Sequence, residues 1–169
     1  DGYRVDHLVG FYRTYGRPRS GGDGFFNPSD ESAQVELGEA VLGVMRQPGS
    51  DIIAEDLGIV PDYVRASLAR LGVPGFRVLR WERLWDLGGQ PFRDPREYPA
   101  SSVATSGTHD TETLAVWWDQ LSQDDRRIFG TLPVVEQISG GGSIDRPFDP
   151  RVRDLLVEAL FASASELLL

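Results

Sequence analysis

The stretch Asp51-Ile-Ile-Ala-Glu-Asp-Leu-Gly-Ile-Val-Pro-Asp62 decides the fold, because it joins a strand, a loop and the start of a helix. The apolar run from Ile52 to Glu55 predicts a short buried strand. Pro61 at the first helical position, Asp62 in the first turn and Gly72 after the last turn predict a helix. A buried strand followed closely by a helix is the repeating unit of a parallel α/β sheet.

The same order of elements recurs on both sides of this stretch. Further strands are predicted at 2–6, 76–81, 102–105 and 166–169. Further helices are predicted at 31–46, with Ser29 or Asp30 as the N-cap, and at 111–121, 123–129 and 150–163. Residues 8–28 are rich in Gly and Pro and are predicted to form a loop, and Gly140 to Gly142 a linker. The sequence therefore predicts an α/β protein with a parallel sheet.

The spacing of the strands favours a barrel over an open sheet. The steps from Glu55 to Val78 and from Val78 to Val103 are close to the ~30 residues that one unit of a (β/α)₈ barrel takes on average. The step from Asp6 to Glu55 is longer because it contains the glycine-rich insertion. Five strands are too few to close a barrel, so we expect residues 1–169 to form a single, partial (β/α)₈ TIM-barrel domain.

Both ends of the chain have the pattern of an interior piece of a longer protein. Residue 1 is not Met and already lies in a strand pattern, and the apolar run at 166–169 stops with nothing to pair against. We therefore expect a barrel domain truncated at both ends. Unpaired edge strands and an open barrel core favour aggregation, so the isolated chain is expected to have little or no activity.

Composition excludes several classes of function. A net charge of −9 repels phosphate backbones, so no nucleic acid partner is expected. No secretory signal or apolar run approaches the ~20 residues that a membrane span needs, so no membrane association is expected. The absence of cysteine excludes disulfides and thiolate sites and fits a cytoplasmic protein.

Three acidic residues, Asp6, Glu55 and Asp110, each follow a short apolar or β-prone run at the start of a loop. In a (β/α) barrel, the carboxyl ends of the strands form the face on which active sites are built. Cleavage of a glycosidic bond needs at least two carboxylates that flank the bond. This arrangement predicts an enzyme that acts on carbohydrates.

Asp6 and Glu55 are the candidates for the two central roles. Arg4, two residues before Asp6 on the same strand face, would keep a nucleophilic carboxylate ionised and hold it in place. Glu55 follows the apolar residues 52–54, and partial desolvation there would keep a proton available for acid/base work. The alternative for Asp6 is a surface ion pair. The alternative for Glu55 is to cap the next helix, although its neighbour Asp56 is better placed for that role.

Asp110 is the third candidate, because a further carboxylate can bind sugar hydroxyls and favour a distorted ring. Its alternative role is the N-cap of the helix predicted to begin near Thr111. His7 and His109 are the only histidines, and each is adjacent to a candidate carboxylate. The zinc motif H-E-x-x-H is absent, so no metal site is predicted.

The chain contains four tryptophans, at positions 81, 85, 117 and 118, which could stack on sugar rings. Trp117 and Trp118 are neighbours on a predicted helix and point about 100° apart, so at most one of them lines a given groove. Packing in the core is the better prediction for most of the four.

Three segments resemble the signature segments of one enzyme family. They are Arg4-Val-Asp-His-Leu-Val-Gly-Phe11, Ile53-Ala-Glu-Asp-Leu-Gly58 and Gly107-Thr-His-Asp110. Taken together they resemble 4-α-glucanotransferases of the amylomaltase type (disproportionating enzyme, glycoside hydrolase family 77), which are relatives of the α-amylases. The three segments occur in the right order, each at a predicted strand end. The resemblance covers essentially the whole chain and implies the later part of the family's barrel, roughly strands 4 to 8.

The resemblance also implies the role of each site residue. Asp6 resembles the nucleophile after the fourth strand, Glu55 the general acid/base after the fifth, and Asp110 the transition-state stabiliser after the seventh. Arg4, His7 and His109 match residues that orient the nucleophile and bind the cleaved sugar. The implied reaction is a retaining double displacement that moves α-1,4-glucan segments between maltodextrins, without a metal or an organic cofactor. The implied partner is a maltooligosaccharide or α-glucan, and the oligomeric state stays open.

Two other functions fit the same residues. Nothing in them decides between a sugar hydroxyl and water as the acceptor, so an α-amylase-like retaining hydrolase is one alternative. A non-catalytic glucan-binding domain on the same fold is the other, because a fold does not fix a function. The presence of all three carboxylates argues against the second alternative.

Overall fold

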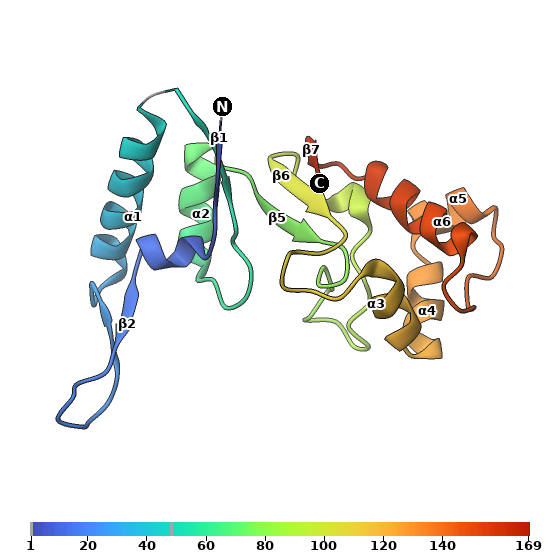
Figure 1. Ribbon diagram of the computed structural model, residues 1–169, viewed down its shortest axis with the longest axis horizontal. Helices are drawn as coiled ribbons and strands as arrows, with labels where there is room; N and C mark the ends of the chain where they lie inside the picture. Colours follow the sequence, from blue (N-terminus) through green and yellow to red (C-terminus); the bar gives the residue numbers. More distant parts are fainter. Residues whose placement is uncertain (1, 48) are drawn as a thin grey trace. The chain divides into compact units, whose positions relative to one another are not determined.

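A computed structural model describes residues 2–47 and 49–169 of the chain (Figure 1). The prediction that the strand pattern already includes residue 1 lies outside these residues. Contacts divide the chain into two compact units, residues 1–76 and 77–169.

The main sheet has the strand order β1-β4-β5-β6-β7. Its strands are β1 (Gly2–Val5), β4 (Asp51–Ala54), β5 (Gly75–Val78), β6 (Ser102–Thr105) and β7 (Leu167–Leu168). The pairs β1–β4, β4–β5 and β6–β7 are parallel. The predicted α/β architecture with a parallel sheet is confirmed.

In the first unit, helices α1 (Glu31–Arg46) and α2 (Asp62–Leu71) lie side by side (Figure 1). The side chain of Asp30 accepts the N–H of Ala33, so Asp30, one of the two candidates predicted, is the N-cap of α1. Pro61 is the N-cap of α2 and not its first helical residue, and Gly72 ends α2 in the left-handed conformation with φ of 64°. The core between these helices and the strands is formed by Val5, Leu8, Tyr12, Leu42, Ile52, Ala54, Val64, Leu68 and Val73.

The segment predicted as a loop at 8–28 contains a 3₁₀ helix and a β-hairpin. The 3₁₀ helix is η1 (Leu8–Phe11), and β2 (Thr14–Gly16) pairs antiparallel with β3 (Phe25–Asn27). Figure 1 shows the hairpin extending away from α1. Tyr15 and Phe26 face each other across it, with ring centroids 5.2 Å apart. Each strand has only three residues, which is too few for an alternation of apolar and polar residues to be recognised in the sequence.

The second unit is mainly helical, and its core includes Ala104 of β6. It contains η2 (Pro95–Glu97), α3 (Leu114–Gln120), α4 (Gln123–Gly130), α5 (Pro133–Ser139) and α6 (Pro150–Phe161). Trp117 and Trp118 lie in its core, but Trp81 and Trp85 are exposed, so core packing holds for two of the four tryptophans and not for most of them as predicted. Among the described residues, no helix combines the length and the apolar character needed to cross a bilayer.

Several predicted element boundaries are wrong, and one helix was missed. The strand expected at 76–81 stops at Val78, because the N–H groups of Trp81 and Glu82 both donate to the Val78 carbonyl and turn the chain. The helix expected from Thr111 begins at Leu114. Helix α5 was not predicted. Its C-cap is Gly140, which adopts the left-handed conformation and is the first of the glycines assigned to a linker.

Candidate active site

The register of β1 on β4 places two of the predicted carboxylates at one end of the sheet. Val5 pairs with Ala54, so Asp6 and Glu55 are the next residues along neighbouring parallel strands. The Glu55 N–H donates to the Val5 carbonyl at 2.9 Å, and the Leu8 N–H donates to the Glu55 carbonyl at 3.2 Å. Adjacent strands lie about 4.8 Å apart, so the two residues leave the sheet as close neighbours.

Asp6 is held by the arginine that the sequence indicated. The Nη2 atom of Arg4 lies 2.9 Å from Oδ1 of Asp6, and the Arg4 guanidinium lies 5.5 Å from the centroid of the Phe76 ring. The side chain of Asp6 is 61% exposed, so it can reach a ligand. An ion pair this exposed adds little stability, so its main physical effect is to orient the carboxylate.

Glu55 is half-buried, and both of its carboxylate oxygens are fixed by backbone donors. Oε2 accepts the N–H of His7 at 2.7 Å, and Oε1 accepts the N–H of Leu57 at 3.0 Å. His7 adopts the left-handed conformation (φ 46°), which residues other than glycine seldom occupy. The loop after β1 is therefore tied to the Glu55 side chain, a role of the His7 backbone that the sequence did not reveal.

Asp56 has a structural role that differs from the expected helix cap. Pro61 occupies the N-cap position of α2 and makes no side-chain capping bond. Asp56 is 3% exposed, and its carboxylate binds Nη1 of Arg65 at 2.6 Å and the N–H of Phe76 at 2.8 Å. It therefore connects α2 to β5.

We expect Gly75→Ala to lower the free energy of unfolding by about 1–3 kcal/mol, because overpacking a filled site forces neighbours to shift. A Cβ on Gly75 would lie 2.5 Å from Oδ1 of Asp56, which its partners hold in place. Gly43→Ala, on α1, is the matched control: no described atom beyond its own helix lies within 4 Å of the added Cβ. This control should gain about 0.5–1 kcal/mol. Urea denaturation of the full-length protein measures both, and an unchanged midpoint for Gly75→Ala would contradict the packing described.

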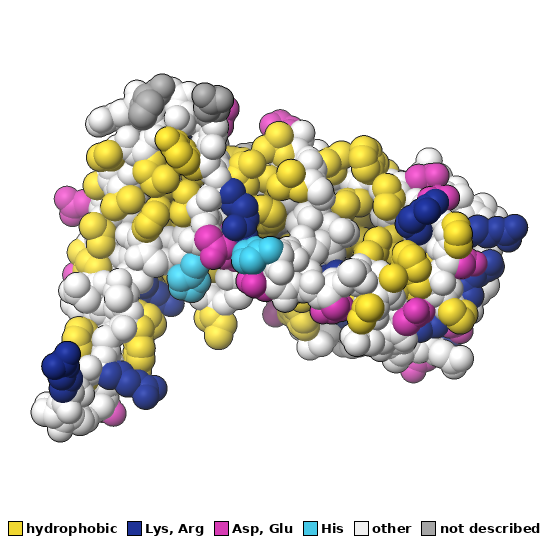
Figure 2. Space-filling view, in the orientation of Figure 1, with side chains coloured by type: hydrophobic (Ala, Val, Ile, Leu, Met, Phe, Trp, Pro, Cys, Tyr) yellow, Lys and Arg dark blue, Asp and Glu magenta, His cyan; other side chains and the backbone are white. Residues whose placement is uncertain are grey.

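The third predicted carboxylate lies in the second unit, in the loop after β6. Oδ2 of Asp110 is 3.2 Å from Nε2 of His109, and both side chains are more than half exposed. Asp110 does not cap a helix, because α3 begins at Leu114 and its N-cap is Thr113. Both histidines of the chain, cyan in Figure 2, reach the surface.

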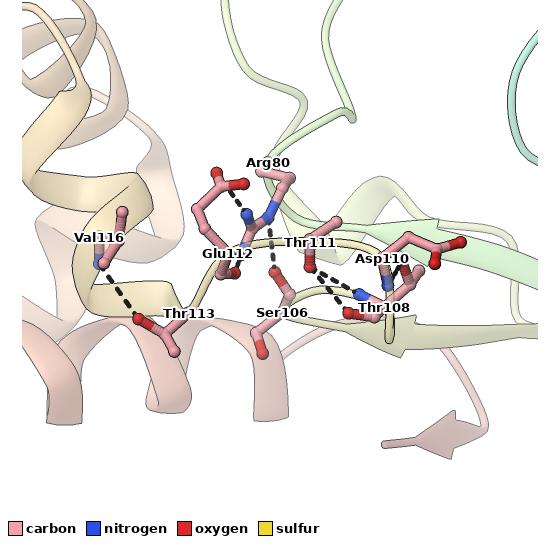
Figure 3. A network of polar contacts seen from close by, with 8 residues as sticks. All are labelled: Arg80, Ser106, Thr108, Asp110, Thr111, Glu112, Thr113 and Val116. Carbon is pink, nitrogen blue, oxygen red and sulfur yellow. Dashed lines mark hydrogen bonds and ion pairs between the residues drawn. The ribbon is translucent and has the colours of Figure 1, made fainter.

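Two threonines hold the loop around Asp110 (Figure 3). The Thr108 N–H donates to Oγ1 of Thr111 at 3.0 Å, and the Thr111 hydroxyl donates back to the Thr108 carbonyl at 2.9 Å. The Asp110 N–H donates to Oγ1 of Thr108 at 3.3 Å. The backbone at Asp110 is thus fixed by local bonds while its carboxylate faces outward.

A buried arginine that the sequence analysis did not single out lies beside this loop. Arg80 follows β5, is 5% exposed, and pairs with Oε1 of Glu112 at 2.7 Å. Burial lowers the pKa of Arg80, and the carboxylate of Glu112 partly offsets this. The available signal was an arginine inside the apolar segment predicted as a strand at 76–81, where a buried charge has to find a partner.

No group of three or more His, Asp or Glu side chains in the described part of the chain is placed to hold a metal ion.

The model for the family described as 4-alpha-glucanotransferase matches residues 1–169. The chain belongs to the 4-alpha-glucanotransferase family. Curated relatives with that name include the protein from Chlamydia pneumoniae, 39% identical over 117 residues, and the one from Chlamydia caviae, 41% identical over 117 residues. Each alignment covers 69% of this chain and 22% of the relative, so the matched part is about a fifth of a curated 4-alpha-glucanotransferase.

Solved amylomaltase structures share the fold of the chain. The amylomaltase from Streptococcus agalactiae, solved in complex with acarbose, superposes with a TM-score of 0.68 at 22% identity, over 99% of this chain and 31% of its own. The Corynebacterium glutamicum amylomaltase gives a TM-score of 0.62 at 23% identity, over 99% of this chain and 27% of its own. At these identities the comparison shows a common α/β fold.

Within this member of the 4-alpha-glucanotransferase family, the predicted site residues fall into two groups. Arg4, Asp6, His7 and Glu55 lie together in the first unit, at the ends of β1 and β4. His109 and Asp110 lie together in the second unit, after β6.

Proposed function

We propose that the protein containing this chain is a 4-α-glucanotransferase of the cytoplasm, and that the chain carries its three catalytic carboxylates. We further propose that β1, β4, β5, β6 and β7 are strands 4 to 8 of a (β/α)₈ barrel. In that case residues 1–169 are one partial catalytic domain. Family membership and the order of the parallel strands support this assignment.

The observation that carries the proposal is the register of β1 on β4, which makes Asp6 and Glu55 neighbours. Retaining enzymes hold their two carboxyl groups ~5–5.5 Å apart, whereas inverting enzymes hold them ~6.5–9.5 Å apart to admit a water molecule. The backbones of adjacent parallel strands are about 4.8 Å apart, so carboxyl groups at equivalent positions can adopt the retaining spacing.

In the proposed mechanism, Glu55 protonates the oxygen of the leaving glucan while Asp6 attacks the anomeric carbon. The glycosidic bond breaks, and a β-glucosyl ester forms on Asp6. Glu55 then takes the proton from the 4-hydroxyl of an incoming maltooligosaccharide, whose oxygen displaces Asp6. The product keeps the α configuration because each displacement inverts the anomeric carbon once.

The other site residues bind the sugar and stabilise charge. Arg4 keeps the Asp6 carboxylate oriented along the line of attack, consistent with their 2.9 Å ion pair. His7, His109 and Asp110 bind hydroxyls of the sugar that is cleaved, and Asp110 favours the distorted, positively charged transition state.

Incubation of the full-length protein with maltotriose tests the proposed function. Transfer should release glucose together with oligosaccharides longer than the substrate, as read by chromatography of the products. Glucose and maltose without any longer product would indicate an α-amylase-like hydrolase, and an unchanged substrate would indicate a glucan-binding domain.

A further inference from the structure

We propose that Arg80 is a positioning residue that fixes the loop after β6 and thereby sets the place of Asp110. The inference rests on the proposed function, because it assigns Arg80 a kinetic effect through the role of Asp110. All the residues it uses lie in the second unit.

The first support is the pattern of bonds that the guanidinium makes. Nε of Arg80 donates to the Ser106 carbonyl at 3.1 Å, and Nη2 donates to the Glu112 carbonyl at 3.0 Å. These two carbonyls lie on either side of Asp110 in the sequence, so one rigid, planar group joins both ends of the loop (Figure 3). Nη1 completes the set by pairing with the Glu112 carboxylate at 2.7 Å.

The second support is the packing around Arg80. Its guanidinium lies 5.6 Å from the centroid of the Trp117 ring, and Trp117 belongs to the core of the unit. On the loop side, a Cβ added to Gly107 would lie 3.0 Å from Nη2 of Arg80 and 2.5 Å from Oγ1 of Thr111. The loop therefore lies directly on the guanidinium, which in turn lies on the core.

The third support is the direction of the Asp110 side chain. In Figure 3 the carboxylate of Asp110 points away from Arg80 and Glu112, so Arg80 acts on Asp110 through the shape of the loop. Thr108 and Thr111 lie between the Ser106 and Glu112 carbonyls in the sequence. Their hydrogen bonds connect the anchored ends of the loop to the backbone of Asp110. If the anchors are lost, Asp110 should shift relative to the sugar.

The test is the kinetics of Arg80→Met and Arg80→Lys in the full-length protein. Misplacement of a catalytic group by about 1 Å can cost about 10²-fold. We expect kcat to fall by about that factor in Arg80→Met, with KM changed by less than about threefold. Arg80→Lys should recover part of the loss, because an ammonium group keeps the charge but cannot join both carbonyls.

Arg126 provides a matched control in the same unit. It also donates to two backbone carbonyls, those of Trp118 and Asp119, at 3.2 and 3.0 Å, and its guanidinium lies 5.8 Å from the centroid of the Trp118 ring. Its bonds join α3 to α4, not the loop of Asp110. Arg126→Met and Arg80→Met should both lower the melting temperature, but Arg126→Met should leave kcat within about twofold of the parent.

Combination with Asp110→Asn separates positioning from general damage. If Arg80 acts through Asp110, Arg80→Met should slow the Asp110→Asn variant by less than about twofold, because effects of residues that act as a unit do not add. A full multiplicative loss in the double variant, or an unchanged kcat in Arg80→Met alone, would overturn the inference. If Arg80→Met does not fold, the same cycle with Arg80→Lys decides. Normal turnover of Asp110→Asn would instead overturn the proposed role of Asp110.

Discussion

Replacement of Asp6 by glycine in the full-length protein is expected to lower kcat for maltodextrin transfer by at least about 10³-fold, because no covalent intermediate can form. Asp6 directly follows β1 and is exposed, and its ion pair with Arg4 adds little stability, so the fold should tolerate the change. Steady-state transfer assays with circular dichroism as a check on folding measure the effect. Asp23→Gly, at an exposed position in the β2–β3 loop, is the control and should keep parental activity.

A small anion should take the place of the missing carboxylate. With α-maltosyl fluoride as donor, azide is expected to attack the anomeric carbon from the side that Asp6 faces, and fluoride leaves with the bonding electrons. The product of Asp6→Gly should be the β-glycosyl azide, which NMR identifies by its anomeric coupling. Formation of the α-glycosyl azide would place the nucleophile elsewhere.

Replacement of Glu55 by glutamine should have an effect that depends on the donor. General acid–base catalysis typically contributes about 10²–10⁴-fold, and transfer between maltodextrins should slow by a factor in that range. Formation of the glycosyl-enzyme from α-maltosyl fluoride should slow much less, because fluoride leaves without a proton. Pre-steady-state fluoride release measures this step, and Glu36→Gln on the exposed side of α1 is the control. Equal slowing with both donors would mean that Glu55 does not protonate the leaving group.

The parts of the fold that the sequence predicted are those with local signals. The bounds of α1 followed from its periodic apolar residues and from Asp30 as its cap. The ends of α2 followed from the flanking Pro61 and Gly72. The β2–β3 hairpin and α5 were missed, because three-residue strands and a seven-residue helix leave too short a pattern.

In the candidate site, too, local patterns predicted some features and missed others. That Asp6 and Glu55 would be neighbours followed from parallel strands that end at the same edge, and the Arg4–Asp6 pair followed from the alternation of strand side chains. The bond from the His7 N–H to Glu55 and the bonds of Arg80 to the loop after β6 join residues far apart in the chain. Such contacts depend on how the strands and the loops after them are arranged in the folded sheet, so no local sequence pattern predicts them.

The most direct test of Asp6 and Glu55 as one catalytic pair is to trap the covalent intermediate. Glu55→Gln in the full-length protein, mixed briefly with α-maltosyl fluoride, should accumulate the glycosyl ester, because the activation of the acceptor is lost. Peptide mass spectrometry after acid quenching is expected to find the added maltosyl mass on Asp6. A maltosyl ester on any other residue, or turnover of the fluoride with Asp6 unmodified at every quench time, would contradict the proposed pair.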